Sequence, residues 1–228
     1  MRGIVVLWAV LAGLNGVFTL WHYSWKGPLT AEEIDTQLAR LLEDFGRQSL
    51  EGETLSSGSE QHIIEFLRAD DGRPFFMLNL MEFRETAAYA NGENPDGLSG
   101  EEAEALYSRY VIPNLLKRGS YPLIITQRLT TITDTMGTGE AEFERFALVR
   151  YRSRRDFLDL ISTPAFGEMA NHKWAGLSGT LVSPTAVQLT LVPSLFVPVL
   201  LIGIGAAGTV LLTWLGRRRG TAPDAKLA

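Results

Sequence analysis

At 228 residues, the chain is long enough for one medium-sized domain or two small ones. It has no cysteine, which excludes disulfides, thiolate nucleophiles and cysteine-ligated metal centres. Residues 27–192 carry 25 Asp and Glu against 15 Lys and Arg, a net charge of −10, and nucleic acid repels such a domain, so we expect no nucleic-acid partner.

The first predicted element is a transmembrane helix over residues 3–25. No charged residue occurs between Arg2 and Lys26, and the apolar stretch over residues 3–21 would span about 28 Å, close to the hydrocarbon thickness of a bilayer. It ends in an aromatic group typical of a membrane interface, formed by Trp21, His22, Tyr23 and Trp25. A cleaved signal peptide is the alternative, but no small-x-small cleavage site follows.

Residues 27–69 are expected to form a helical arm between the membrane and a domain. Thr30 and Glu33 make a capping box at the start of an amphipathic helix. The apolar stripe of that helix consists of Ile34, Leu38, Leu41, Leu42 and Phe45. The stripe must be buried on the domain, on the bilayer surface or on a partner.

Residues 73–191 are expected to form a single α+β domain. Strands are predicted over residues 75–83, 121–133, 143–151 and 179–191, with helices over residues 99–119, 153–161 and 165–174. Ser99 and Glu102 make a second capping box. The resulting order β-α-β-β-α-β is that of the ferredoxin-like fold.

A second transmembrane helix is predicted over residues 193–216, followed by a basic, disordered tail over residues 217–228. The tail opens with three arginines, residues 217–219. By the positive-inside rule, these arginines and Arg2 place both termini in the cytoplasm, so the domain would lie outside it. In a bacterium, this means the inner (cytoplasmic) membrane with a periplasmic domain.

Small residues in the two apolar segments predict close helix packing. Gly203, Gly205 and Gly208 match the G-x-G-x-x-G dinucleotide fingerprint, but inside an uncharged span rather than after a strand. We interpret them as helix-packing residues, with Ala207 and Thr209 four positions after Gly203 and Gly205. The first helix offers a similar face at Ala12 and Gly16. The alternative is that these small residues face lipid by chance and pack against no helix.

The domain resembles a domain-of-unknown-function branch of the dimeric α+β barrel superfamily. The residues that carry the resemblance are Phe-Met-Leu-Asn-Leu at 76–80, Tyr107-x-x-Tyr110-x-x-Pro113, residues 146–154 with Phe157, residues 163–166, and residues 172–177. The likeness covers residues 73–181. It implies a ferredoxin-like protomer whose sheet pairs with a second copy to close a barrel. Lys173 stands where the resemblance leads us to expect arginine.

Two side chains are weak catalytic candidates. Glu168 lies four residues before His172, so on a helix its carboxylate could orient the imidazole, as general bases require. The alternative is a surface Glu–His pair on an amphipathic helix. One histidine and one carboxylate are too few for a metal site, so no metal is predicted.

Five side chains are candidates for ligand binding: Asn79, Tyr107, Tyr110, Arg150 and Arg152. Asn79 could point into the barrel from an otherwise apolar strand, or be a buried amide satisfied locally. The tyrosines could equally be core residues. Arg150 and Arg152 share a face of the strand by alternation and could clamp an anion, or be solvated charges.

These features predict a non-catalytic accessory or structural subunit of a larger membrane protein complex. Its two helices would pack on membrane lipid and on other subunits or each other, and its domain would cap the assembly outside. No cofactor is predicted. The alternative is a membrane-tethered enzyme or binding protein that holds haem or a small aromatic ligand inside the barrel.

Overall fold

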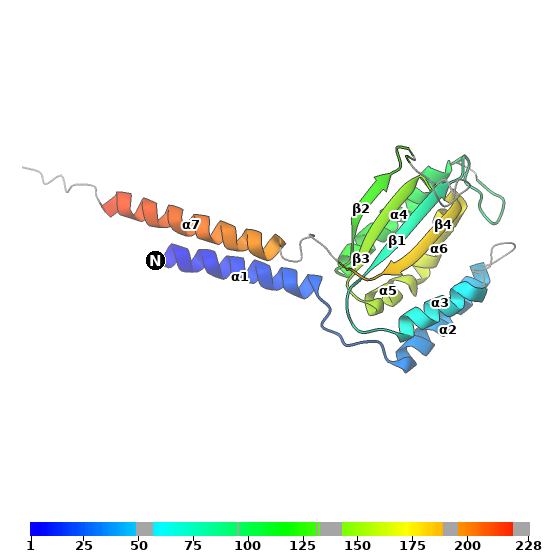
Figure 1. Cartoon of the computed structure of the whole chain (residues 1–228), viewed down its shortest axis with the longest axis horizontal. Coiled ribbons are helices and arrows are strands. Elements are labelled where there is room, and N and C mark those ends of the chain that lie inside the picture. The colour runs from blue at the N-terminus through cyan, green and yellow to red at the C-terminus, as the bar shows by residue number, and fades with distance from the viewer. Residues whose placement is uncertain (49–56, 95, 131, 133–142, 189–195, 221–228) are drawn as a thin grey trace, which may run out of the picture. The chain divides into compact units, whose positions relative to one another are not determined.

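The computed structural model describes residues 1–48, 57–94, 96–130, 132, 143–188 and 196–220. The chain divides into two compact units. The first consists of Met1–His22 and Leu189–Ala228, and the second of Tyr23–Gln188. The helices and strands follow one another in the order α1-α2-α3-β1-α4-β2-β3-α5-α6-β4-α7 (Figure 1).

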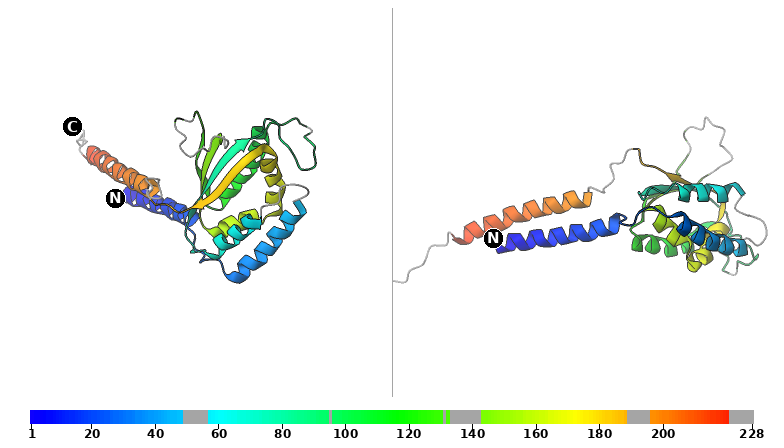
Figure 2. Two further views of the ribbon diagram at one scale, coloured as in Figure 1. Left: turned by 45° about the vertical axis from the view of Figure 1, so that its right-hand side comes forward. Right: turned by 90° about the horizontal axis from the view of Figure 1, so that it is seen from below.

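The first unit contains the two terminal helices, α1 (Arg2–His22) and α7 (Phe196–Gly220). Both are long and apolar enough to cross a membrane, as the sequence predicted. The two helices lie side by side and run in opposite directions (Figure 2). The indole Nε1 of Trp8 donates a hydrogen bond of 3.0 Å to Thr209 Oγ1, which links them directly.

The second unit is built on a four-stranded sheet. Its strands are β1 (Phe75–Phe83), β2 (Tyr121–Gln127), β3 (Arg145–Tyr151) and β4 (Leu177–Thr185). Their order across the sheet is β2-β3-β1-β4, and every neighbouring pair is antiparallel. Residues directly opposite each other in antiparallel strands share a face, so the register assigns each side chain to one of two faces.

Three helices pack against one face of this sheet: α4 (Gly100–Lys117), α5 (Arg154–Ile161) and α6 (Pro164–Gly176). The core between sheet and helices includes Phe75, Met77, Leu115, Tyr151 and Leu158. Where α4 begins and α6 ends, the backbones nearly touch. A Cβ on Gly100 would lie 2.3 Å from the carbonyl oxygen of Gly176, so only glycine fits there.

The predicted arm packs on the domain. It contains α2 (Ala31–Gln48) and α3 (Ser57–Arg68), which lie side by side (Figure 1). Ile34 and Leu38 of the predicted stripe are buried in the same cluster as the domain core. Of the three predicted burial sites for the stripe, the domain is therefore the one observed. The side chains of Leu41, Leu42 and Phe45 lie outside the described residues.

Both predicted capping boxes are confirmed. At α4, the Glu102 amide donates to Ser99 Oγ at 3.3 Å, and the Ser99 amide donates to the Glu102 carboxylate at 2.9 Å. At α2, Thr30 and Glu33 make the same reciprocal pair at 3.2 and 2.8 Å. Each box satisfies amide donors that the first turn of a helix leaves open.

Three strands have bounds that differ from the prediction. β3 begins at Arg145 rather than at residue 143. β2 ends at Gln127 rather than at residue 133, and residues 131 and 133 of the predicted strand lie outside the described residues. β4 begins at Leu177, two residues before the predicted start, because α6 ends directly against it at Gly176. The predicted end of β4, residues 189–191, lies outside the described residues.

Candidate functional site

A set of polar side chains lies between the sheet and helices α4 and α6. We call it the buried polar cluster, and it consists of Asn79, Glu104, Ser108, Arg145 and Lys173. Three of these groups are charged, and Glu104 and Lys173 are buried with exposed fractions of 6% and 7%. Charged groups are rarely buried without a specific role, so this cluster is the candidate functional site of the domain.

Lys173 is the least satisfied member of the cluster. Its Nζ donates one long hydrogen bond, 3.4 Å, to Asn79 Oδ1. The ammonium also lies over two aromatic rings, 5.5 Å from the centroid of Tyr107 and 5.4 Å from that of Trp174. Burial removes the ammonium from water and lowers the pKa of Lys173 to about 8, and the nearby Glu104 carboxylate offsets only part of this effect.

Glu104 and Arg145 form the satisfied part of the cluster. Glu104 Oε2 accepts from Arg145 Nη1 at 3.2 Å, and Glu104 Oε1 accepts from Ser108 Oγ at 2.6 Å. Arg145 reaches a second carboxylate on α4, Glu101, at 3.3 Å, and stacks over the ring of Phe83. Glu104 therefore forms its ion pair with Arg145 and stabilises the Lys173 charge only in part.

Asn79 lies on the helix-covered face of the sheet. Along β1 it alternates with Met77 and Met81, which are core residues, and its Nδ2 donates to the Met77 carbonyl at 3.3 Å. Asn79 is therefore bonded within the protomer, in line with the second of the two predicted alternatives, an amide satisfied locally. Its Oδ1 accepts from Nζ of Lys173, which lies on the sheet-facing side of helix α6.

His172 has a partner that the sequence did not reveal. Its Nδ1 lies 2.7 Å from the hydroxyl of Tyr89, and the two rings meet edge to face. Burial raises the pKa of Tyr89, so the phenol keeps its proton at neutral pH. In the part of the chain that the structure describes, no hydrogen bond joins Glu168 to His172, and Glu168 is exposed.

The two tyrosines on α4 have different surroundings. Tyr107 packs edge to face on Phe166 and forms one wall around Lys173. Its burial raises the pKa of the phenol well above the ordinary value. Tyr110 packs against the core cluster, and its carbonyl accepts from the side chain of Asn114. The structure therefore brings Tyr107, but not Tyr110, into contact with the buried polar cluster.

Arg150 and Arg152, which could have clamped an anion, both bind groups of the domain itself. Arg150 Nη1 donates to the Gly119 carbonyl at 3.2 Å, and its guanidinium lies over the ring of Tyr121. Burial lowers the pKa of Arg150. Arg152 binds both carboxylate oxygens of Asp156 at the start of α5. Both contacts hold the ends of strands and helices together, which is a structural role.

The second face of the sheet is apolar, and among the described residues of this unit no helix packs on it. In register, Leu78 lies opposite Leu148, Leu80 lies opposite Phe146, and Ile124 extends the row on β2. These side chains are partly or fully exposed, with Ile124 at 52% and Leu181 on β4 at 50%. Soluble monomeric proteins rarely expose a contiguous apolar face of this kind.

In the first unit, two of the predicted packing glycines meet the other helix. A Cβ on Gly205 would lie 2.6 Å from the ring of Trp8, and one on Gly208 would lie 2.6 Å from Leu7. A Cβ on Gly203 or Gly16 would meet nothing within 4 Å. Gly203 and Ala207 instead line an open apolar groove on α7.

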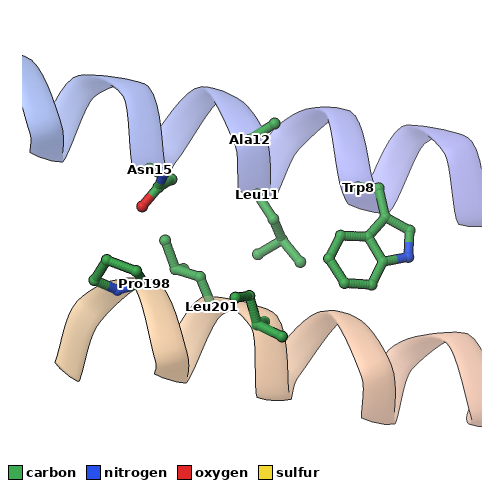
Figure 3. A pocket seen from close by; sticks show the side chains of 7 residues that line it. Trp8, Leu11, Ala12, Asn15, Pro198 and Leu201 are labelled. Atoms are coloured by element: carbon green, nitrogen blue, oxygen red, sulfur yellow. The ribbon is translucent and has the colours of Figure 1, made fainter. Parts of the chain in front are cut away.

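A cavity of about 170 Å³ lies between α1 and α7, next to the Trp8 contact (Figure 3). Its lining is apolar apart from Asn15, and it includes Ala12, Leu11, Pro198 and Leu201. The Oδ1 atom of Asn15 is buried and accepts no hydrogen bond from the described residues. Ala12, a predicted packing residue, therefore borders a space rather than a close contact.

Sequence reasoning missed the members of the cluster other than Asn79. Glu104 follows Glu101 and Glu102 at the start of a helix, so the sequence does not distinguish it from carboxylates that are exposed to solvent. Lys173 was noted only as a departure from the expected arginine. The signal that was present is the absence of any charge for more than forty residues after Lys173, which leaves it on an apolar segment. Among the described residues, no group of three His, Asp or Glu side chains could hold a metal ion.

No protein-family model and no curated protein matches the chain. The solved structures with similar folds include two crystal structures of RPA0582, a protein of unknown function from Rhodopseudomonas palustris. The methylated form is 21% identical, with a TM-score of 0.51, and the match covers 64% of this chain and 96% of that one. The other is 21% identical, with a TM-score of 0.49, covering 61% and 98%. At this identity the likeness shows the fold alone.

Proposed function

We propose that the chain is a membrane-anchored accessory subunit. Helices α1 and α7 cross the membrane and pack on other subunits, and the α+β domain lies outside the cytoplasm and pairs with a second copy. The observation that carries this proposal is the uncovered apolar face of the sheet, because Ile124, Leu181 and their neighbours need a partner to leave water.

The order of the elements supports a ferredoxin-like protomer of the dimeric α+β barrel type. Strands β1 and β2 flank α4, strands β3 and β4 flank α5 and α6, and all neighbours in the sheet are antiparallel. In such a protomer, one face carries the helices, and the other faces a second sheet. The apolar row formed by Leu78, Leu80, Phe146 and Leu148 is suited to that contact.

The anchoring part of the proposal rests on the two apolar helices. Their close contact at Gly205 and Gly208 supports a preformed pair, because in lipid such contacts depend on small residues that let backbones approach. The groove at Gly203 and Ala207 on α7 is not used by α1, so it is available to a helix of another subunit. Arg2 and Arg217 support cytoplasmic termini.

Two isoleucines on β2 provide a matched test of the sheet-mediated dimer. Ile124 lies opposite Leu148 on the uncovered face, and Ile125 lies opposite Ala147 on the helix side. They are 52% and 50% exposed, so a glutamate at either position is tolerated equally by the isolated protomer. We expect Ile124→Glu, but not Ile125→Glu, to lower the mass of the assembly, measured by light scattering in mild detergent, by the loss of the paired copy. Equal masses for both variants would contradict the proposed dimer.

The proposed topology is testable because the chain has no native cysteine. A single cysteine replaces Glu85, which is exposed on the domain, or Ala225 in the tail. In intact cells, a membrane-impermeant maleimide should label Glu85→Cys and should label Ala225→Cys only after the cells are broken. The reverse pattern would place the domain in the cytoplasm.

The buried polar cluster favours a second candidate function, the binding of a small apolar or aromatic ligand. Lys173 is a buried charge with one long hydrogen bond, and the rings of Tyr107 and Trp174 flank it. Such an arrangement costs folding free energy, and a bound ligand that offers the ammonium a hydrogen-bond acceptor would offset part of that cost. Denaturing mass spectrometry of the extract from purified protein tests this candidate, and an extract that is empty for wild type and Lys173→Met alike counts against it.

A further inference from the structure

One end of the sheet receives both connections to the apolar helices. Strand β1 begins and β4 ends there, because Phe76 lies opposite Thr185, after which the chain leads to α7. The chain from α1 is held at the same end, where a Cβ on Gly72 would lie 3.4 Å from Pro28. We call this end of the domain the tethered end, and it consists of residues 23–35, 68–76, 116–121, 150–159 and 185–188.

The chain is fixed to the domain almost as soon as it leaves α1. Arg155 donates hydrogen bonds to the Pro28 carbonyl at 2.9 Å and to the Gly27 carbonyl at 3.3 Å. Helix α1 ends at His22, so only residues 23–26 lie between it and this attachment. Fully extended, that stretch spans at most about 18 Å. With α1 crossing the membrane as proposed, the tethered end therefore lies within that reach of the lipid headgroups.

Charge is distributed unevenly along the domain. The tethered end carries nine Lys and Arg against seven Asp and Glu, a net charge of +2, whereas residues 27–192 together have a net charge of −10. At the opposite end, β1 ends and α4 begins, and four Lys and Arg stand against eight Asp and Glu. That end consists of residues 82–94, 96–104, 127–130, 144–145 and 173–179. An anionic surface therefore attracts the tethered end and repels the opposite one.

The tethered end exposes basic side chains beside apolar ones. Lys26, Lys117 and Arg73 are exposed, and the Arg73 side chain is 83% exposed. Trp25 precedes Lys26 and is 67% exposed, and Leu116 precedes Lys117 and is 44% exposed. Cations that can reach phosphate, next to a tryptophan and a leucine, suit the boundary between lipid headgroups and hydrocarbon.

The acidic side chains of the tethered end mostly have partners there. Four carboxylates form ion pairs with arginines of the same end: Glu33, Asp35, Asp156 and Asp159. Asp71 approaches Arg73, but at 3.9 Å and with both side chains more than half exposed, so water screens this pair. Lys26, Lys117 and Arg73 are therefore the charges of this end that are most open to an outside partner.

We propose that the tethered end lies on the headgroups of anionic phospholipids, where Lys26, Arg73 and Lys117 bind lipid phosphates and Trp25 enters the interface. This inference rests on the proposed membrane anchoring and is independent of the sheet-mediated dimer. The acidic opposite end then points away from the bilayer, so the lipid surface holds the domain in one orientation.

The test uses the full-length protein in vesicles of phosphatidylcholine, with or without an equal part of phosphatidylglycerol. A fluorophore is attached through Pro74→Cys at the tethered end or through Glu85→Cys at the opposite end, and both positions are exposed. The nine residues of β1, about 30 Å, separate them. A nitroxide on the lipid headgroup quenches a fluorophore that lies near it. We expect phosphatidylglycerol to increase quenching at Pro74→Cys and not at Glu85→Cys.

Charge variants show whether the basic side chains cause this increase. Each basic residue next to an anionic surface shifts the equilibrium about fivefold towards the bound state. Arg73→Gln combined with Lys117→Gln should therefore weaken binding about thirtyfold and remove the effect of phosphatidylglycerol, as should high salt. Arg109→Gln removes an exposed charge from the middle of α4 and should behave like the wild type.

Quenching at Pro74→Cys that phosphatidylglycerol leaves unchanged would overturn the proposal. Equal losses in Arg109→Gln and in the double variant would also overturn it. Either result would leave the anchoring standing as long as the protein floats with the vesicles in alkaline carbonate. Protein that fails to float would remove the anchoring and the lipid contact together.

Discussion

Replacing Lys173 by methionine removes the charge from the buried polar cluster and keeps an unbranched side chain of similar length. In the folded protein the pKa of Lys173 is about 8, compared with the ordinary 10.5 that applies when the chain is unfolded. At 1.36 kcal/mol for each pH unit, this difference corresponds to about 3 kcal/mol of stability lost by burying the ammonium. Lys173→Met should therefore raise the free energy of unfolding by about that amount at pH 7.

The sign of the pH dependence follows from the same values. Below pH 8 both folded and unfolded chains hold the proton, so the cost of burial is complete. Between pH 8 and 10.5 the unfolded chain holds it more strongly, so the stability of the wild type rises with pH. The advantage of Lys173→Met should disappear by about pH 10.5.

Urea unfolding of wild type and Lys173→Met in detergent, followed by circular dichroism at pH 7 and pH 10.5, measures this difference. Taking the difference between the two proteins cancels other groups that titrate at high pH. The exposed Lys117→Met serves as the control and should shift stability by less than about 0.5 kcal/mol. A variant that is less stable at pH 7, or whose advantage is unchanged at pH 10.5, would refute the reasoning.

Three further substitutions test the packing contacts. Gly100→Ala should destabilise the domain by more than about 3 kcal/mol, or prevent folding, because its Cβ would lie 2.3 Å from a backbone oxygen; thermal unfolding measures this. Gly205→Ala should lower the midpoint of unfolding in SDS titration, because its Cβ would clash with Trp8, whereas Gly203→Ala should not. Arg155→Met should lower the protection of α2 amides against hydrogen exchange, because it removes the ion pair with Glu33; the same loss of protection, taken relative to the intrinsic exchange rate at each pH, should develop in wild type as pH falls from 4.5 towards 2, because the folded chain lowers the pKa of Glu33 to about 2.

Matched controls separate these effects from general damage. Gly27→Ala introduces a methyl group into open space and should leave the unfolding temperature unchanged. Arg68→Met removes an exposed ion pair with Asp35 between the arm helices α3 and α2 and should leave exchange in the first turn of α2 unaltered. Equal effects of Arg68→Met and Arg155→Met would mean that the Glu33 contact does not hold α2.

The sequence predicted the elements of the domain better than the contacts between them. Caps and hydrophobic periodicity are local, so the helix starts at Thr30 and Ser99 were predicted correctly. The sequence did not predict which surface the arm packs on. An apolar stripe that includes Ile34 and Leu38 shows that the helix must be buried against something, but it does not identify the domain, the bilayer or a partner. Burial of the stripe in the domain core became visible only with the sheet in place.

The chemistry was harder to predict than the fold. Asn79 was singled out correctly as unusual on an apolar strand, but its face could not be fixed without the register of β1 with β3. His172 was paired with Glu168 by helical spacing, whereas its observed partner, Tyr89, comes from a loop more than eighty residues earlier. Contacts between distant segments carry no periodic signal, so neither the partner of His172 nor the partners of Lys173 could be predicted from one sequence, although the uncharged stretch after Lys173 set that lysine apart.

The most direct test of the central proposal is the mass of the intact assembly. Tagged protein is extracted from its native membrane in mild detergent, and its composition and mass are measured by native mass spectrometry. The proposal predicts two copies of the chain together with other membrane proteins in fixed ratio, and loss of the paired copy in Ile124→Glu but not in Ile125→Glu. A single copy that purifies alone and is unchanged by Ile124→Glu would contradict it.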